Sequence, residues 1–269
     1  MTDSSSGPHQ RPRIDTSVPH SARVWNYWLG GKDHYPVDRA VGDQVMEMFP
    51  AITRIARADR VFLGRAVRYL AGEAGIRQFL DIGTGLPTAN NTHQVAQAIA
   101  PQARIVYVDN DPLVLAHARA LLTSTPEGAC DYIDADFRDT DVILAEAAKT
   151  LDFTQPIGLM LLAIAGQIPD SDRPGTIIRQ LLDALPSGSY LSLVDGVNTS
   201  EILNDAIRRY NETSANTYHL RSPEQIAGFF EGLELVEPGI VPITRWRAEP
   251  TPFIDSSEVP SMCGVGRKP

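Results

Sequence analysis

A short segment in the middle of the chain has the residue types of a nucleotide-binding turn. Asp81 is followed by Gly83, Thr84 and Gly85 at the end of an apolar run. Glycines let the backbone turn sharply and come close to a ligand, and open α/β sheets bind ligands at the carboxyl ends of their strands. We therefore expect these four residues to form part of a ligand-binding site.

A carboxylate follows at the end of the next apolar run. Asp109 ends the run 105–109 and comes one helical segment after the glycine turn. A carboxylate at the end of a second strand is suited to accept hydrogen bonds from the two ribose hydroxyls of an adenosine. We expect Asp109 and its neighbour Asn110 to belong to this site, and Asp111 to cap the helix that follows.

A third acidic turn follows the run 130–133. It contains Asp136 and Phe137, whose carboxylate and ring can bind the amino group and the ring plane of an adenine. A solvated acidic loop is the alternative reading of this turn. Its position after the third strand of the same unit favours the ligand-binding interpretation.

The elements that must position these groups alternate between strands and helices. The predicted strands are continuous apolar runs, which is typical of parallel strands covered on both faces. Seven such strands predict an α/β fold with a doubly wound sheet. The predicted strands are 78–82, 105–109, 130–133, 157–164, 189–195, 233–236 and 262–265, and the predicted helices lie near 51–72, 91–100, 111–123, 140–149, 173–185, 199–211 and 222–231.

The composition narrows the functional classes. The 269 residues carry a net charge of −9, so an extended nucleic-acid surface, which needs clustered Lys and Arg, is not expected. No apolar run reaches the roughly 18 residues that would cross a bilayer, and the polar N-terminus is unlike a signal peptide, so we expect a cytoplasmic protein without a membrane partner. Cys130 and Cys263 lack metal-ligand spacing, and we expect neither a metal site nor a disulfide.

Together these motifs resemble a known family. The runs 22–33, 77–88, 106–112, 245–247 and 264–269 are similar to the actinobacterial S-adenosylmethionine-dependent methyltransferase family formerly called DUF574. The resemblance extends from Ser21 to the C-terminus. It implies a Rossmann-like class I methyltransferase fold, with a seven-stranded, mostly parallel sheet, helices on both faces, an N-terminal helical cap, and S-adenosylmethionine bound over residues 83–85.

The resemblance also implies that the N-terminal segment folds across the cofactor. We expect a disordered tail over residues 1–20, a cap over 21–75 and the cofactor-binding domain over 76–269. The cap would contribute Tyr27, the hinge glycine Gly30, and Lys32 or Arg60, which could meet the methionine carboxylate of the cofactor, as could Arg23. Aromatic residues at helical spacing can equally be ordinary core.

The acceptor side is less defined. The family typically carries His-Phe after the fourth strand, where this chain has Gly166-Gln167, and the sequence assigns no catalytic residue. Gln167 and Asp195 are candidates by their position at strand ends. We expect an unidentified, small-molecule methyl acceptor, and the sequence assigns no oligomeric state.

Two other functions share parts of this pattern. A nicotinamide-dependent dehydrogenase would need a third glycine at Thr88, and Pro87 interrupts the turn. A regulatory protein that binds S-adenosylmethionine without transferring its methyl group is the second alternative, since a fold does not by itself establish an activity.

Overall fold

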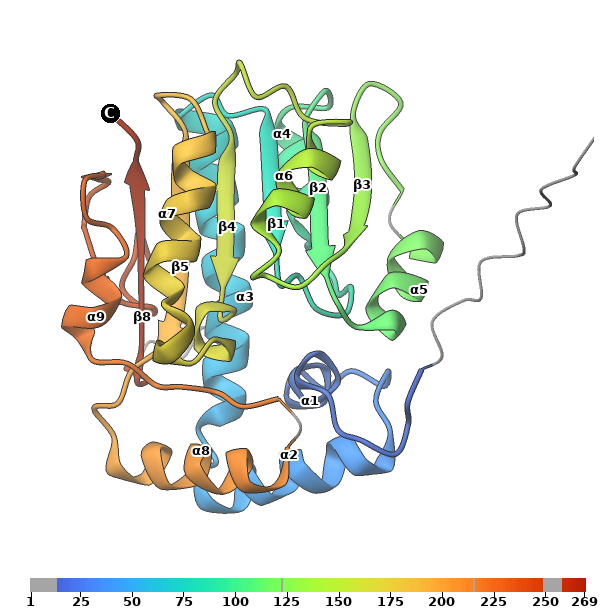
Figure 1. Cartoon of the computed structure of the whole chain (residues 1–269), viewed down its shortest axis with the longest axis vertical. Helices are drawn as coiled ribbons and strands as arrows, with labels where there is room; N and C mark the ends of the chain where they lie inside the picture. The colour runs from blue at the N-terminus through green and yellow to red at the C-terminus, as the bar shows by residue number, and fades with distance from the viewer. Residues whose placement is uncertain (1–13, 122, 215, 249–257) are drawn as a thin grey trace, which may run out of the picture.

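An eight-stranded sheet forms the centre of the computed structural model, which describes residues 14–121, 123–214, 216–248 and 258–269 (Figure 1). Strands β1 to β5 pair in parallel, and β8 runs antiparallel to β5, β6 and β7. The strand order is β3 (Ala129–Asp134), β2 (Arg104–Asp109), β1 (Gln78–Ile82), β4 (Gly158–Leu162), β5 (Tyr190–Gly196), β8 (Ser261–Arg267) and β6 (Glu234–Leu235), with β7 (Val241–Pro242) also on β8.

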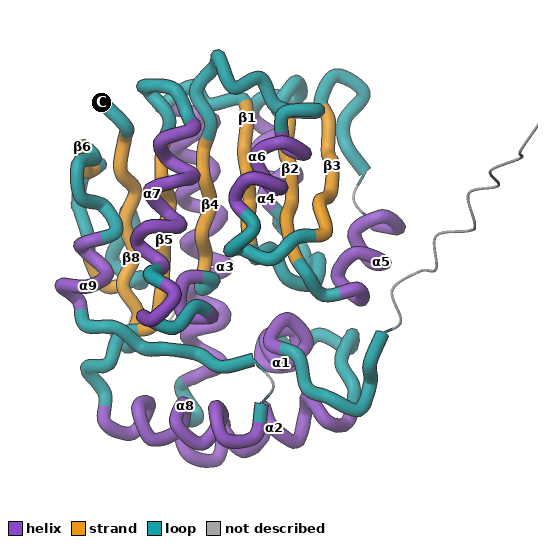
Figure 2. The backbone as a smooth tube through the Cα atoms, in the orientation of Figure 1, coloured by secondary structure: helices purple, strands orange, loops and turns teal. Residues whose placement is uncertain are grey.

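Helices cover both faces of this sheet, which explains why its strands are apolar throughout (Figure 2). Alternate side chains enter two separate cores, so Phe79 of β1 packs on one side and Leu80 on the other. The first face is covered by α3 (Ile52–Arg68), η1 (Tyr69–Glu73) and α4 (Thr92–Ile99), and the second by α6 (Thr140–Ala147), α7 (Pro174–Ala184) and α9 (Pro223–Gly228).

A further helical layer lies beyond the carboxyl ends of the parallel strands (Figure 1). It is made of α1 (Ser21–Trp28), α2 (Pro36–Met48) and α8 (Glu201–Thr213), and α2 packs against both of the others. The edge where a doubly wound sheet binds ligands is therefore covered by helices. Helix α5 (Pro112–Leu121) and the short turns η2 (Ala165–Gln167) and η3 (Asp170–Asp172) follow β2 and β4 at this edge.

The fold class predicted from the sequence is confirmed, with two additions. All seven predicted strands are present, and the eighth, β7, is two residues long and pairs with β8. Helix α2 was not predicted, although Pro36 at its first turn and Asp38, whose carboxylate caps the Tyr35 N–H, are typical of a helix start.

The N-terminal tail is only partly covered by the structure. Residues 1–13 of the predicted tail lie outside the described residues, so its mobility there stays a prediction. Residues 14–20 lead into α1, where the His20 side chain accepts a hydrogen bond from the Ala22 N–H. Within the described ranges, no helix is long and apolar enough to cross a membrane.

Candidate functional site

A cavity of about 360 Å³ lies between the carboxyl edge of the sheet and the helices beyond it. Its lining comes from the ends of β1, β2, β4 and β5, from the turn after β3, and from α1, α3 and α8. Nine of the twelve sequence-predicted site residues line it. They are Asp81, Gly83, Thr84, Gly85, Asp109, Asn110, Asp136, Phe137 and Arg60.

The glycine turn after β1 is held in a conformation that favours glycine. Gly83 and Gly85 have φ of 74° and 65°. A Cβ on Gly83 would come within 2.6 Å of Ile164, so no larger residue fits there without a shift. The Gly85 N–H points toward β2 and donates to Asp109 Oδ2 over 2.8 Å. The turn is thus tied directly to the carboxylate that was predicted to bind ribose.

Asp109 is fixed at the end of β2 by two backbone donors. Besides the Gly85 N–H, the Asp111 N–H donates to its Oδ1 over 3.0 Å. Burial raises the pKa of Asp109, while these two hydrogen bonds lower it. Each carboxylate oxygen has two lone pairs, so both can still accept from the hydroxyls of a ribose. The carboxylate is therefore oriented before a ligand arrives.

The acidic turn after β3 meets the end of β2 at the same place. Asn110 Nδ2 donates to Asp136 Oδ2 over 3.2 Å, and Arg138 pairs with the same carboxylate at 3.1 Å. Phe137 is buried and lines the cavity. A polar edge beside an aromatic ring fits an adenine. Together with the glycine turn and Asp109, this arrangement fits an adenosine-containing cofactor.

Asp81 and Arg60 lie at the other end of the glycine turn. Thr92 donates to Asp81 Oδ2 over 2.6 Å. Burial raises the pKa of Asp81 to about 6, and the Thr92 hydrogen bond and the Arg60 charge oppose that shift. Arg60 itself donates to the carbonyls of Ala89 and Asn90. The Asp81 carboxylate and the Arg60 guanidinium could thus bind a ligand that carries one positive and one negative charge.

The other three predicted residues do not line the cavity. Tyr27 donates to Asp43, Gly30 ends α1 with open space around it, and Lys32 is exposed. Helix α1 turns a different face to the cavity, with Trp25, Asn26, Trp28 and Leu29 among its lining residues. Aromatic residues were expected at this place, but the sequence did not indicate which face of the helix points inward.

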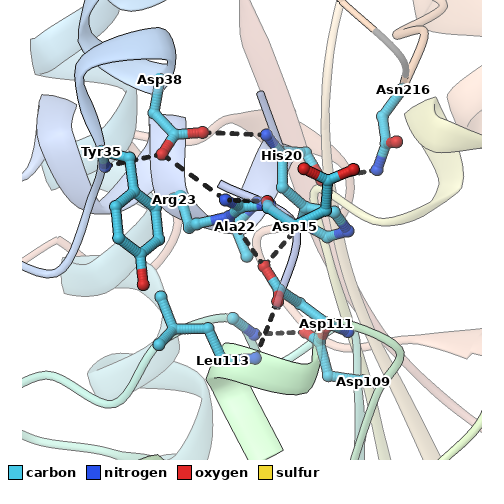
Figure 3. Close-up of polar contacts among 12 residues, drawn as sticks. Asp15, His20, Ala22, Arg23, Tyr35, Asp38, Asp109, Asp111, Leu113 and Asn216 are labelled. Carbon is cyan, nitrogen blue, oxygen red and sulfur yellow. Dashed lines mark hydrogen bonds and ion pairs between the residues drawn. The ribbon is translucent and has the colours of Figure 1, made fainter. Parts of the chain in front are cut away.

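The N-terminal segment is fastened over the cavity by buried ion pairs (Figure 3). Arg23 Nε lies 3.2 Å and His20 Nδ1 lies 3.0 Å from Asp111 Oδ2. Asp38 of α2 accepts from the His20 N–H over 2.9 Å and lies 3.8 Å from Arg23. Arg23, Asp38 and Asp111 are all buried. These contacts join α1 and α2 to the start of α5, two residues after Asp109.

Gly166, where the resemblance implied a different residue, lies against Asp195 and Tyr218. A Cβ on Gly166 would come within 2.8 Å of Asp195 Oδ1 and even closer to the Tyr218 ring. Tyr218 donates its hydroxyl proton to that same Asp195 oxygen. Glycine at position 166 therefore makes room for Tyr218 against Asp195, and both residues line the cavity together with Gln167.

Asp59 is a cavity residue that the sequence analysis missed. It lies on the same face of α3 as Ile52, Ile55 and Leu63, which also line the cavity. Only 6% of Asp59 is exposed. A single carboxylate within an apolar stripe is the sequence signal that could have identified it, because such a group is costly to bury without a function.

The charge on Asp59 should lower the stability of the free protein at neutral pH. Burial raises its pKa to about 7, the Arg60 charge lowers it, and Asp195 and Asp81 raise it. The unfolded carboxyl titrates near pH 4, so the folded state binds more protons between about pH 4 and 7 and the free energy of unfolding falls as pH rises through that window. The stability of Asp59→Asn relative to the parent should therefore increase by about 2 kcal/mol from pH 5 to pH 8.

Urea unfolding of both proteins at the two pH values measures this difference. Asp183→Asn, which changes an exposed carboxyl on α7, is the control and should show no such trend. Equal pH dependence of Asp59→Asn and the parent would contradict the prediction.

Comparison with known proteins agrees with a site for an adenosine-containing cofactor. Residues 7–269 match the family described as "S-adenosyl methyltransferase". A DUF574 family protein from Streptomyces avermitilis is 45% identical, with 96% of this chain and 100% of that chain aligned and a TM-score of 0.91. A protein from Thermobifida fusca is 41% identical over 96% and 97% of the two chains, with a TM-score of 0.87.

More distant solved structures share the fold alone. The S-adenosylmethionine-dependent methyltransferase from Anabaena variabilis is 13% identical, with 95% of this chain and 98% of that chain aligned and a TM-score of 0.51. Among curated proteins, none matches the chain.

Proposed function

Because the chain belongs to the S-adenosyl methyltransferase family, we propose that it transfers the methyl group of S-adenosylmethionine to a small molecule held in the same cavity. The observation that carries this proposal is the continuity of the cavity. It runs from Asp109 and Phe137 at one end to Asp195 at the other, beneath α1. A donor and an acceptor can therefore lie in one continuous cavity.

We assign the donor to the half of the cavity next to β1, β2 and β3. Asp109 accepts from the ribose hydroxyls, Asp136 and Phe137 bind the adenine, and Gly83 and Gly85 let the backbone approach the ligand. Asn110 and Thr84 complete the wall around the sugar. Asp81 and Arg60 bind the amino and carboxylate groups of the methionine part.

We assign the acceptor to the half between β5, α3 and α8. S-adenosylmethionine supplies a methyl group already activated by its sulfonium, so the protein has mainly to orient the acceptor and exclude water. Trp25 and Trp28 of α1 line the cavity, as do Leu203 and Ile207 of α8. A concave site lined by apolar side chains and covered by helices favours a small molecule over a macromolecule.

The division into domains is part of the proposal. Residues 76–269 provide most of the cofactor site; within residues 21–75, α1 and α2 close the cavity, while α3 and η1 pack on the first face of the sheet. The packing of α1 and α2 beyond the carboxyl edge supports the cap, and the ion pairs of Arg23 keep it closed. Neither the family match nor the solved structures described above support the alternative of a regulatory protein without transferase activity.

Transfer of a labelled methyl group tests this function. The protein, given S-adenosylmethionine with a labelled methyl group and an extract of Streptomyces avermitilis, should place the label in the low-molecular-mass fraction that passes an ultrafiltration membrane. Asp109→Ala is the control and should give much less label because it binds the donor weakly. Label found only in the protein or nucleic-acid fraction would contradict a small-molecule acceptor.

A further inference from the structure

We propose that the methyl acceptor is an amine, and that Asp59 and Asp195 receive its nitrogen between them. This inference rests on the proposed function and adds the chemical class of the acceptor. It follows from two carboxyls that line the same cavity and come from different elements. Asp59 comes from α3, and Asp195 comes from the end of β5.

Asp59 lacks a partner that would explain its burial. In the described part of the chain no N–H or O–H donates to its carboxylate, and its face of α3 is otherwise apolar. A buried carboxyl without a hydrogen bond is costly to fold around. The residue lines the cavity, so a donor that enters the cavity can supply the missing hydrogen bond.

Asp195 has one oxygen engaged and one free. Its Oδ1 accepts from the Tyr218 hydroxyl and from the Gly196 N–H, while Oδ2 is buried without a partner among the described residues. Only 1% of Asp195 is exposed. Asp195 lies close enough to Asp59 for its charge to raise the pKa of Asp59. The two carboxyls thus line the same region of the cavity.

The basic side chains that line the cavity have contacts other than Asp59 and Asp195. Arg60 donates to the backbone at Ala89 and Asn90, Arg138 pairs with Asp136 and Asp172, and His20 pairs with Asp111. The charge of Arg60 lowers the pKa of Asp59, and that of Arg221 lowers the pKa of Asp195, but burial has the larger effect on both.

The rest of the acceptor half suits the body of an organic amine. Aromatic and aliphatic side chains surround the two carboxyls, and aromatic faces attract cations as well as apolar groups. A carboxylate acceptor would instead face two negative charges. The apolar side chains that line the cavity include Trp25, Trp28, Leu203, Ile207, Tyr210 and Leu220.

The carboxyls also provide what methylation of an amine needs. An ammonium must lose a proton before its nitrogen can attack, and a carboxylate whose pKa is raised toward 7 is a better proton acceptor than an ordinary one. The proton passes to the carboxylate, and the freed lone pair forms the N–C bond. The C–S bond breaks, its electron pair stays on sulfur, and the products are the N-methylammonium and a neutral thioether.

Binding of matched ligand sets tests the proposal. Benzylamine, 2-phenylethylamine and tryptamine are each compared with the alcohol and the carboxylate of similar skeleton, at pH 8 and with saturating S-adenosylhomocysteine. Calorimetry should show at least one amine bound about tenfold more tightly than its alcohol, and no binding of the carboxylates. Asp59→Asn should weaken that amine about tenfold and change S-adenosylhomocysteine affinity by less than about twofold.

Controls separate the possible failures. Asp205→Asn, which changes an exposed carboxyl on α8, should leave both affinities unchanged. Alcohols that bind as well as amines, or no amine bound by a protein that binds S-adenosylhomocysteine, would overturn the amine proposal alone. A large loss of S-adenosylhomocysteine binding in Asp59→Asn would assign Asp59 to the amino group of the cofactor instead. Failure of the parent protein to bind S-adenosylhomocysteine would overturn the proposed function itself.

Discussion

Replacing Arg23 by alanine should lower the free energy of unfolding by about 3 kcal/mol and Tm by roughly 6–12 °C. Arg23 lies between the buried carboxylates of Asp111 and Asp38. Removing one member of a buried ion pair leaves a charge without compensation, which costs much more than losing an exposed pair. Thermal and urea unfolding of the variant measure the effect.

Arg208→Ala is the matched control for this variant. Arg208 pairs with Asp205 on the surface of α8, and its side chain is 69% exposed. Its removal should change the free energy of unfolding by less than about 1 kcal/mol. A similar, small loss in both variants would show that the contacts of Arg23 do not hold the cap in place.

The second large effect is expected on cofactor affinity. Asp109→Ala removes the proposed acceptor of the ribose hydroxyls and the group that fixes the Gly85 N–H. Hydrogen bonds to a charged group contribute about 1.5–3 kcal/mol, so the Kd for S-adenosylhomocysteine should rise roughly ten- to a hundredfold. Calorimetry measures the affinity, and circular dichroism checks that the variant is folded.

A neighbouring carboxylate provides the control for Asp109. Asp134 ends β3 beside Asp109 in the strand register, but it is exposed and is not part of the cavity lining. Asp134→Ala should bind S-adenosylhomocysteine like the parent. If a folded Asp109→Ala also binds like the parent, Asp109 does not hold the ribose.

The sheet was predictable because local signals and tertiary structure agree there. Continuous apolar runs mark β1 to β5, and the residues that follow them, Asp81 to Gly85 and Asp109, reach the cavity because parallel strands end at one edge. The family resemblance added the cofactor. The strands and the family motifs were both recognisable because each is formed by a short, continuous segment of the chain.

The remaining features depend on contacts between distant segments. The pairing of Arg23 with Asp111 joins residues 88 positions apart, and no local pattern indicates it. For Tyr27 and Lys32 the sequence predicted the segment but not the inward face of its helix. Strand β7 contains only two residues, one of them a proline, which is too short for any alternation to mark it.

The short link between Asp109 and Asp111 connects binding of the nucleoside with closure of α1 over the cavity. Asp109 faces the cofactor half of the cavity, Asp111 holds Arg23 and His20, and the Asp111 N–H donates to Asp109. Binding free energies are reciprocal. If a bound nucleoside increases the equilibrium constant for closing α1 by some factor, closing α1 increases the affinity for the nucleoside by the same factor. Binding of the nucleoside and closure of α1 would then favour each other at equilibrium, although neither Arg23 nor Asp111 lines the cavity.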